Sequence, residues 1–179
     1  RVKVLSPLPS APWAALFGAG GASLAEGIDY AAELDELIAG LGPSWQGGVS
    51  RVYLDTFPTT VAARSELLWQ VNAGRNWVTY YGHASPATWS RETLLDAIDL
   101  PGQLNNAGRW PVVSEYGCWG GYFVEPTYST LAHAWLLTAD RGARAMLASA
   151  SLTESSSDRA IAQALIPQVA TPGIRLGDA

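Results

Sequence analysis

The feature that most constrains the fold is an alternation of short apolar segments with longer segments of helical periodicity. Residues 30–41 carry apolar side chains at the i, i+3, i+4, i+7 spacing of one helix face, and Gly42 follows. The short segments have the length and content of buried strands. The alternation predicts an α/β fold with a mainly parallel sheet. Strands are expected at residues 14–17, 50–54, 77–81, 111–116 and 144–148, and helices at 30–41, 61–71, 91–98, 129–139 and 158–169.

The chain has 179 residues, of which 48% are hydrophobic, and this is the size and apolar content of one compact domain. We therefore expect residues 1–179 to form a single domain. The chain begins with Arg1 rather than Met and stops in what resembles the start of another element. This suggests a piece of a longer protein with neighbouring domains.

Charge and hydropathy exclude two classes of partner. The net charge is −5, with 11 Lys and Arg against 16 Asp and Glu, and the cations do not cluster. Nucleic-acid binding needs a basic face, so no nucleic-acid partner is expected. The longest apolar stretches are too short and too rich in glycine to span a bilayer, so no membrane span is expected.

The only cysteine and one of the two histidines follow consecutive predicted strands. His83 comes after strand 77–81, and Cys118 comes after strand 111–116. Ligands of open α/β sheets bind at the carboxyl ends of the strands, so the two side chains are expected in one cleft. A cysteine nucleophile needs a base, and an imidazole is the usual one.

A lone cysteine in an apolar strand is commonly core filler, and this interpretation has to be weighed against catalysis. Gly117, Gly120 and Gly121 surround Cys118, and Gly82 precedes His83. These glycines leave room for a substrate backbone, which favours a catalytic pair.

Two runs of residues resemble a known family. Residues 76–85, Asn-Trp-Val-Thr-Tyr-Tyr-Gly-His-Ala-Ser, with Trp89 following, resemble the histidine block of gingipain-type cysteine peptidases, members of the caspase-like clan. Residues 111–123 resemble their cysteine block. Segments 104–106, 129–132, 142–146 and 176–179 match in order and spacing, so the resemblance covers about residues 14–179. It implies a caspase-like three-layer sandwich, with helices on both faces of a mainly parallel sheet.

The resemblance implies that Cys118 is the nucleophile and His83 the general acid and base of peptide-bond cleavage through a thioester. The oxyanion hole would use the backbone amides of Cys118 and Ala84. The family has glycine at the position of Ala84, and the methyl group matters if φ there must be positive. Gly117, Trp89 and Trp119 flank the pair and are expected to contact substrate.

A specificity residue is implied at Asp29, because Asp29-Tyr30 resembles the pair that holds a substrate arginine in Arg-specific gingipains. The alternative is that Asp29 caps the helix of residues 30–41. The pocket tryptophan of those enzymes has no counterpart in residues 149–158, a Ser-rich loop that we expect to form a cleft wall.

Two carboxylates are candidates for orienting His83. Glu115, three residues before Cys118, points to the opposite sheet face from Ser114 and Tyr116. Three roles are open for it: it orients His83, pairs with a nearby Arg, or is satisfied locally. Glu26, in the Gly-rich segment after the first strand, is the other candidate. His133 is expected on a helix, far from both.

The sequence therefore predicts a cysteine endopeptidase domain with protein or peptide substrates, located outside the cell or at its surface, as in the family. The alternatives are a catalytically silent peptide-binding or scaffold domain and an acyl-transferring relative. No cofactor or metal is expected, since two histidines 50 residues apart offer no ligand spacing. The sequence is silent on a structural calcium ion.

Overall fold

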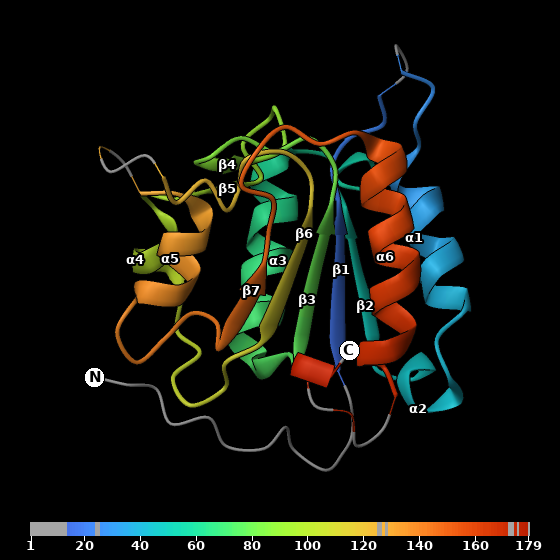
Figure 1. The fold of residues 1–179 in the computed structure, drawn as a ribbon. Helices are drawn as coiled ribbons and strands as arrows, with labels where there is room; N and C mark the ends of the chain where they lie inside the picture. Colours follow the sequence, from blue (N-terminus) through green and yellow to red (C-terminus); the bar gives the residue numbers. More distant parts are fainter. Residues whose placement is uncertain are drawn as a thin grey trace.

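The computed structural model describes residues 14–23, 26–124, 127, 129–171, 174 and 176–178. A five-stranded parallel sheet forms its centre (Figure 1). In spatial order the strands are β2 (Val49–Tyr53), β1 (Ala15–Ala19), β3 (Trp77–Tyr81), β6 (Val112–Tyr116) and β7 (Ala145–Leu147). A small antiparallel pair, β4 (Thr88–Trp89) and β5 (Leu95–Asp96), lies between β3 and β6 in the chain.

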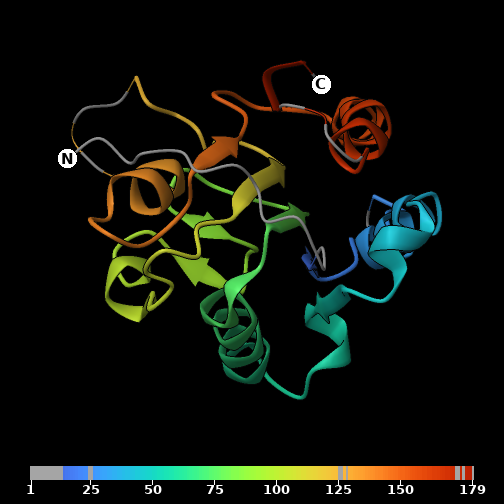
Figure 2. The same cartoon turned by 90° about the horizontal axis from the view of Figure 1, so that it is seen from below.

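Helices cover both faces of the sheet, which makes a three-layer sandwich (Figure 2). One face carries α1 (Tyr30–Ala39), α6 (Ser155–Val169) and the short α2 (Pro43–Gln46). The other carries α3 (Thr60–Gly74), α4 (Leu100–Gln103) and α5 (Leu131–Leu137). Two 3-10 turns span Leu54–Thr56 and Leu176–Asp178. None of the helices in these described ranges is long and apolar enough to cross a membrane.

Side chains of each central strand alternate between two apolar cores. In β6, Val113 and Glu115 face the α3 and α5 side, while Val112 and Tyr116 face the α1 and α6 side. Burial of the apolar side chains of each core contributes on the order of tens of kcal/mol, at about 25 cal/mol per Å² of apolar surface removed from water, and this opposes the loss of chain entropy on folding. The sheet therefore separates two environments at every strand end.

The predicted fold class is confirmed, and each of the five expected strands forms. The helix predicted over residues 91–98 is wrong: this segment makes turns and the short strand β5. Ser90 and Thr93 adopt left-handed backbone conformations with φ of 62° and 60°, which stop a helix from growing through them. The amide of Leu94 donates back to the carbonyl of Trp89. Leu94, Leu95 and Ala97 are buried by this compact turn, whereas Ile98 is exposed.

The strand order changes direction at β1, because the next strand along the chain, β2, lies on one side of β1 and β3 lies on the other. The loops after β1, β3 and β6 consequently meet at one edge of the sheet. Backbone hydrogen bonds continue past the strands there: Gly20 donates to Tyr81, and Gly82 donates to Tyr116. These bonds hold the loops that carry the candidate site.

Candidate active site

A cavity of about 410 Å³ opens at the carboxyl ends of β3 and β6. His83 and Cys118 both line it, as the strand-end rule predicts. The loop before α1 contributes Glu26, and the start of α6 contributes Asp158. Residues 153–155 form part of the wall, so the expected position of the loop 149–158 is confirmed.

Glycines bring the two catalytic candidates to this edge. Gly117 packs so closely on the loop after β3 that a Cβ at this position would clash with the carbonyl oxygen of Gly82. Gly82 itself has a φ of 153°, and a Cβ there would lie 2.8 Å from the Tyr80 hydroxyl oxygen. The loops can approach backbone to backbone only because both residues lack side chains.

Cys118 is half-buried and contacts one residue of the opposite wall, Thr153. The Thr153 amide donates to Sγ at 3.5 Å. The Thr153 carbonyl oxygen and hydroxyl Oγ1 each lie 3.6 Å from Sγ. The thiol therefore faces the cavity wall through three polar atoms of a single residue.

His83 is held from both its backbone and its ring. The buried Tyr80 hydroxyl donates to the His83 carbonyl at 2.7 Å, and the Tyr30 ring packs edge-on against the imidazole at 5.7 Å between centroids. Oε2 of Glu26 lies 3.4 Å from Nε2, and Arg91 lies 3.9 Å from the other carboxylate oxygen. Of the two predicted orienting carboxylates, Glu26 is the one beside His83.

The floor of the cavity carries polar groups that the sequence analysis missed. Asp158 is 6% exposed and accepts a hydrogen bond of 2.7 Å from the Thr153 hydroxyl. Burial raises the pKa of its carboxyl, and the Thr153 bond opposes this. The buried Tyr116 hydroxyl has no hydrogen-bond partner among the described residues. Burial, and to a smaller degree the Asp158 charge, raises the pKa of Tyr116 to about 12.

The sequence places Asp158 at the start of a predicted helix, but the predicted boundary is three residues too late. The predicted helix begins at residue 158, whereas α6 begins at Ser155. Asp158 therefore lies in the first turn of α6, next to the cavity, where a carboxylate also complements the helix dipole. Thr153 and Asp158 both fall within the segment expected to form the cleft wall.

Ala84 lies beside the cysteine loop. A Cβ built on Gly117 would be 3.6 Å from the Ala84 backbone nitrogen. Ala84 forms an isolated antiparallel bridge with Trp89, and its φ is not positive. The methyl group of Ala84 therefore causes no backbone strain at this position.

Glu115 lies on the other side of the sheet. It is 3% exposed, and Trp89 Nε1 donates to its Oε2 at 2.6 Å. Burial raises the pKa of Glu115 to about 8, opposed by the bonds from Trp89 and the Gly120 backbone. The prediction that Glu115 supports His83 is corrected: adjacent strand residues face opposite ways, so Glu115 does not line the cavity.

The two tryptophans expected to contact substrate differ in placement. Trp89 has no exposed surface and stacks on Tyr80 at 4.6 Å, so its predicted substrate contact is corrected to a core role. Trp119 is half-buried, has a φ of 69° and packs edge-on against Tyr122. Its amide donates to Ser151, which ties the cysteine loop to the cleft wall.

Asp29 is exposed, and its carboxylate accepts a hydrogen bond from the Ala32 amide at 2.9 Å. This is N-cap geometry for α1, the second of the two interpretations. Asp29 does not line the cavity, although both Ile28 and Tyr30 do. His133, on α5, accepts from the Thr130 amide in a capping box and lines neither cavity.

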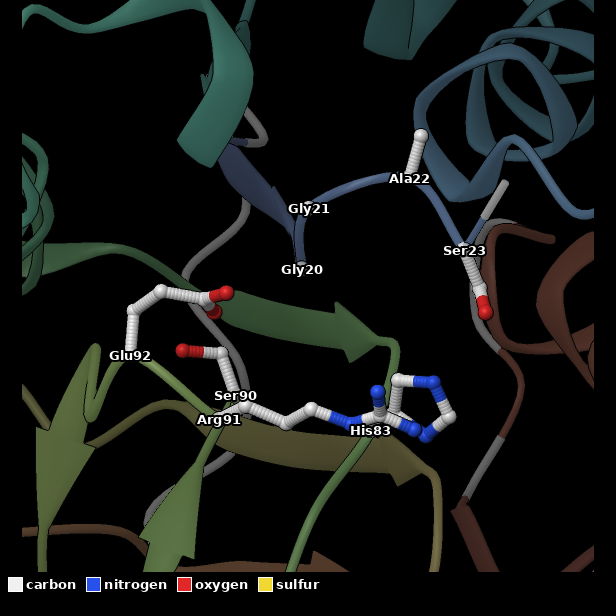
Figure 3. Close-up of a pocket in the computed structure, with 8 residues that line it drawn as sticks. All are labelled: Gly20, Gly21, Ala22, Ser23, His83, Ser90, Arg91 and Glu92. Carbon is white, nitrogen blue, oxygen red and sulfur yellow. The ribbon is translucent and has the colours of Figure 1, made fainter. Parts of the chain in front are cut away.

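A smaller cavity of about 70 Å³ shares His83 with the first. Figure 3 shows the loop after β1 on one side and residues 90–92 on the other, with the Arg91 side chain extending towards His83. Within the described ranges, no group of three or more His, Cys, Asp or Glu side chains could hold a metal ion.

A three-layer α/β sandwich with a thiol and an imidazole at neighbouring strand ends defines a cysteine-peptidase type of domain. The chain belongs to peptidase family C25, whose model matches residues 10–179. No curated protein matches the chain.

Solved structures show the same fold. The Arg-specific cysteine proteinase gingipain R (RgpB) is 15% identical, with a TM-score of 0.69 over 89% of this chain and 36% of that one. A complex of the Porphyromonas gingivalis RgpB pro- and mature domains is 16% identical, with a TM-score of 0.70 over 92% of this chain and 38% of that one. A structure described only as a protease is 17% identical, with a TM-score of 0.62 over 87% of this chain and 33% of that one. The chain thus spans a third or slightly more of these proteins.

Proposed function

We propose that this domain is the catalytic part of a cysteine endopeptidase in which Cys118 is the nucleophile and His83 the general acid and base. The observation that carries the proposal is that the only cysteine and His83 line one cavity at adjacent strand ends. Membership of family C25 supports it.

The position of Glu26 supports separate tasks for the two imidazole nitrogens of His83. A carboxylate beside Nε2 favours the tautomer with its proton on Nε2, which leaves a lone pair on Nδ1. Nδ1 then takes the thiol proton as sulfur attacks the scissile carbonyl carbon, and returns it to the leaving amine as the C–N bond breaks. Water hydrolyses the thioester in the second half of the reaction.

The oxyanion of the tetrahedral intermediate would be bound by the backbone amides of Cys118 and Ala84. Amides aimed at a developing oxyanion are each worth about 3 kcal/mol in enzymes where one has been removed. The closeness of Ala84 to the cysteine loop supports this pairing. An amine in place of water would give acyl transfer from the same thioester.

The substrate class follows from the charge of the cavity. Three carboxylates line it, at Glu26, Glu154 and Asp158, and no Lys or Arg is among the described residues of its lining. Asp158 and the unpartnered Tyr116 hydroxyl offer a charged and a neutral oxygen at the floor. We therefore expect an arginine or lysine side chain at P1, the residue before the scissile bond. The smaller cavity would take the leaving-group side, since it also borders His83.

The physiological setting is proposed on the same basis. We expect a secreted or surface peptidase that acts on proteins or peptides, within a longer chain and without a cofactor. The pro- and mature domains of RgpB form a complex, and we expect a comparable protein partner for this domain.

Turnover of fluorogenic peptides that differ only at P1 tests the proposal. Cys118→Ala and His83→Ala should each lower kcat/KM for an Arg substrate by a thousandfold or more, with the circular dichroism spectrum unchanged. His133→Gln is the control for histidine, because His133 lies on α5 and lines neither cavity, and it should retain activity. Full turnover by Cys118→Ala would overturn the proposal.

A further inference from the structure

One side chain stands between the nucleophile and the pocket acid. Thr153 Oγ1 lies 3.6 Å from Cys118 Sγ and 2.7 Å from Asp158 Oδ2. The sequence offers no motif for this arrangement. It arises because the segment after β7 folds over the cysteine loop, and α6 then begins at Ser155.

The hydrogens of this chain of contacts can be assigned from chemistry. An ionised carboxylate has no proton, so the short Oγ1 to Oδ2 bond uses the single hydrogen of the Thr153 hydroxyl. Oγ1 therefore presents only lone pairs to Cys118. Together with the Thr153 carbonyl, it suits a protonated S–H donor, and of the three Thr153 atoms near Sγ only the amide can stabilise a thiolate.

We propose that Thr153 is a positioning residue that couples occupation of the Asp158 pocket to activation of Cys118. When a cation in the pocket becomes the partner of Asp158, the Thr153 hydroxyl hydrogen turns about the Cβ–Oγ1 bond and is donated to the Cys118 sulfur. The thiol proton passes to His83, and the hydroxyl proton stays on Thr153, so no covalent bond changes at Thr153. The inference rests on the proposed function and deepens it: a basic P1 side chain is both bound and needed for full reactivity.

Other charged groups of the cavity act on the thiol and have to be separated from this effect. Glu26, Glu154 and Asp158 all disfavour a thiolate, and a protonated His83 favours it. Any bound cation therefore promotes the thiolate by Coulomb attraction alone. Tyr30, Tyr81 and Tyr116 stay neutral, because burial raises the pKa of each. The contribution of the Thr153 hydroxyl is the difference in the cation-induced shift between wild type and a variant that lacks the hydroxyl but keeps every charge.

Variants at Thr153 make this separation. Thr153→Val removes the hydroxyl and keeps the shape and the amide, whereas Thr153→Ser restores the hydroxyl. The readout is the pH dependence of Cys118 alkylation by iodoacetamide, followed by mass spectrometry on the intact chain, with and without ethylguanidinium. This measurement needs no turnover, so it stands apart from the peptidase assay.

Ethylguanidinium should move the alkylation midpoint of wild type and Thr153→Ser to lower pH by about one unit or more, the size of one hydrogen bond to a charged group. The shift in Thr153→Val should be less than half as large, and Asp158→Asn should show almost none. Alkylation of free glutathione should not respond. An equal shift in Thr153→Val and wild type would overturn the inference and leave the peptidase proposal intact. A shift that depends on the hydroxyl, without any peptide cleavage, would support the inference about Thr153 and overturn the peptidase proposal.

Discussion

Two buried carboxyl groups lie on opposite sides of the sheet near Cys118, and they differ in what reaches them. Asp158 borders the cavity and is bonded to the mobile hydrogen of a threonine hydroxyl. Glu115 is sealed behind Trp89 and packs on the Gly120 backbone. Burial raises the pKa of both. A perturbed acid therefore marks a site of chemistry only where a ligand can reach it.

The two sides of the sheet have different roles around Cys118. On the α3 and α5 side, Glu115 joins Trp89 of the histidine block to Gly120 of the cysteine block. We call this three-residue contact the brace. On the α1 and α6 side, polar groups stay open to a ligand. The loop that carries Cys118 is therefore held in place on the α3 and α5 side, and a ligand can reach it on the α1 and α6 side.

The largest effect is expected from filling the brace. In Gly120→Ala the new Cβ would collide with the Glu115 carboxyl, which is buried and held by the hydrogen bond from Trp89 Nε1. The free energy of unfolding should fall by about 3 kcal/mol, the upper end for overpacked sites. Urea denaturation measures this, with Gly102→Ala as control, because a Cβ at Gly102 meets nothing within 4 Å. Equal stability of Gly120→Ala and wild type would show that the brace is not rigid.

The second-largest effect is expected in the pH dependence of the unfolding free energy. The pKa of Glu115 rises from 4.5 to about 8 on folding, so the folded chain holds a proton that the unfolded chain releases. This stabilisation is complete below pH 4.5 and is lost as the pH rises towards 8. Over that window it falls by about 1.4 kcal/mol per pH unit.

Glu115→Gln keeps an oxygen for Trp89 and removes the titration. Urea unfolding at pH 5, 6 and 7 should therefore show a flatter slope for Glu115→Gln than for wild type. Parallel slopes would mean that Glu115 is ionised in the folded state and that the brace is an anion site.

On the cavity side, Glu26→Gln should impair catalysis without changing stability. It removes the carboxylate charge 3.4 Å from His83 Nε2, and the lost Coulomb stabilisation of the imidazolium, about 2 kcal/mol for partly screened charges, should lower kcat roughly thirtyfold. Steady-state kinetics with a P1 Arg peptide measures the loss. Glu36→Gln, on α1, is the control. An unchanged kcat would remove Glu26 from the mechanism.

The sequence predicts the cavity side better than the brace. The positions of Cys118 and His83 follow from one rule about strand ends, which needs only the strand boundaries and glycines. The brace depends on the path of residues 84–97, where a helical pattern competes with left-handed turns at Ser90 and Thr93. Local periodicity carries no information on that outcome, so the burial of Trp89 could not be foreseen.

Asp29 and Asp158 teach the same lesson on a smaller scale. Both acids lie near helix starts, and sequence position alone cannot tell a cap from a pocket acid. The amide of Ala32 reaches Asp29, whereas α6 begins three residues before Asp158 and leaves its carboxylate beside the cavity.

The smallest effect is therefore expected at Asp29. Asp29→Ala should cost about 1 kcal/mol of unfolding free energy through the lost cap, and Asp29→Asn only a few tenths. Neither should change the P1 profile of a positional-scanning peptide library, whereas Asp158→Asn should lose the preference for a basic residue. A changed profile in Asp29→Asn would return the pocket acid to Asp29.

Covalent labelling tests the central claim most directly. Peptide acyloxymethyl ketones with P1 Arg or P1 Glu react with an activated thiol, and mass spectrometry locates the adduct. The account predicts stoichiometric labelling of wild type at Cys118, at least tenfold faster for the P1 Arg probe, and slow labelling of His83→Ala. Absence of an adduct at Cys118, or equal rates for both probes, would contradict it.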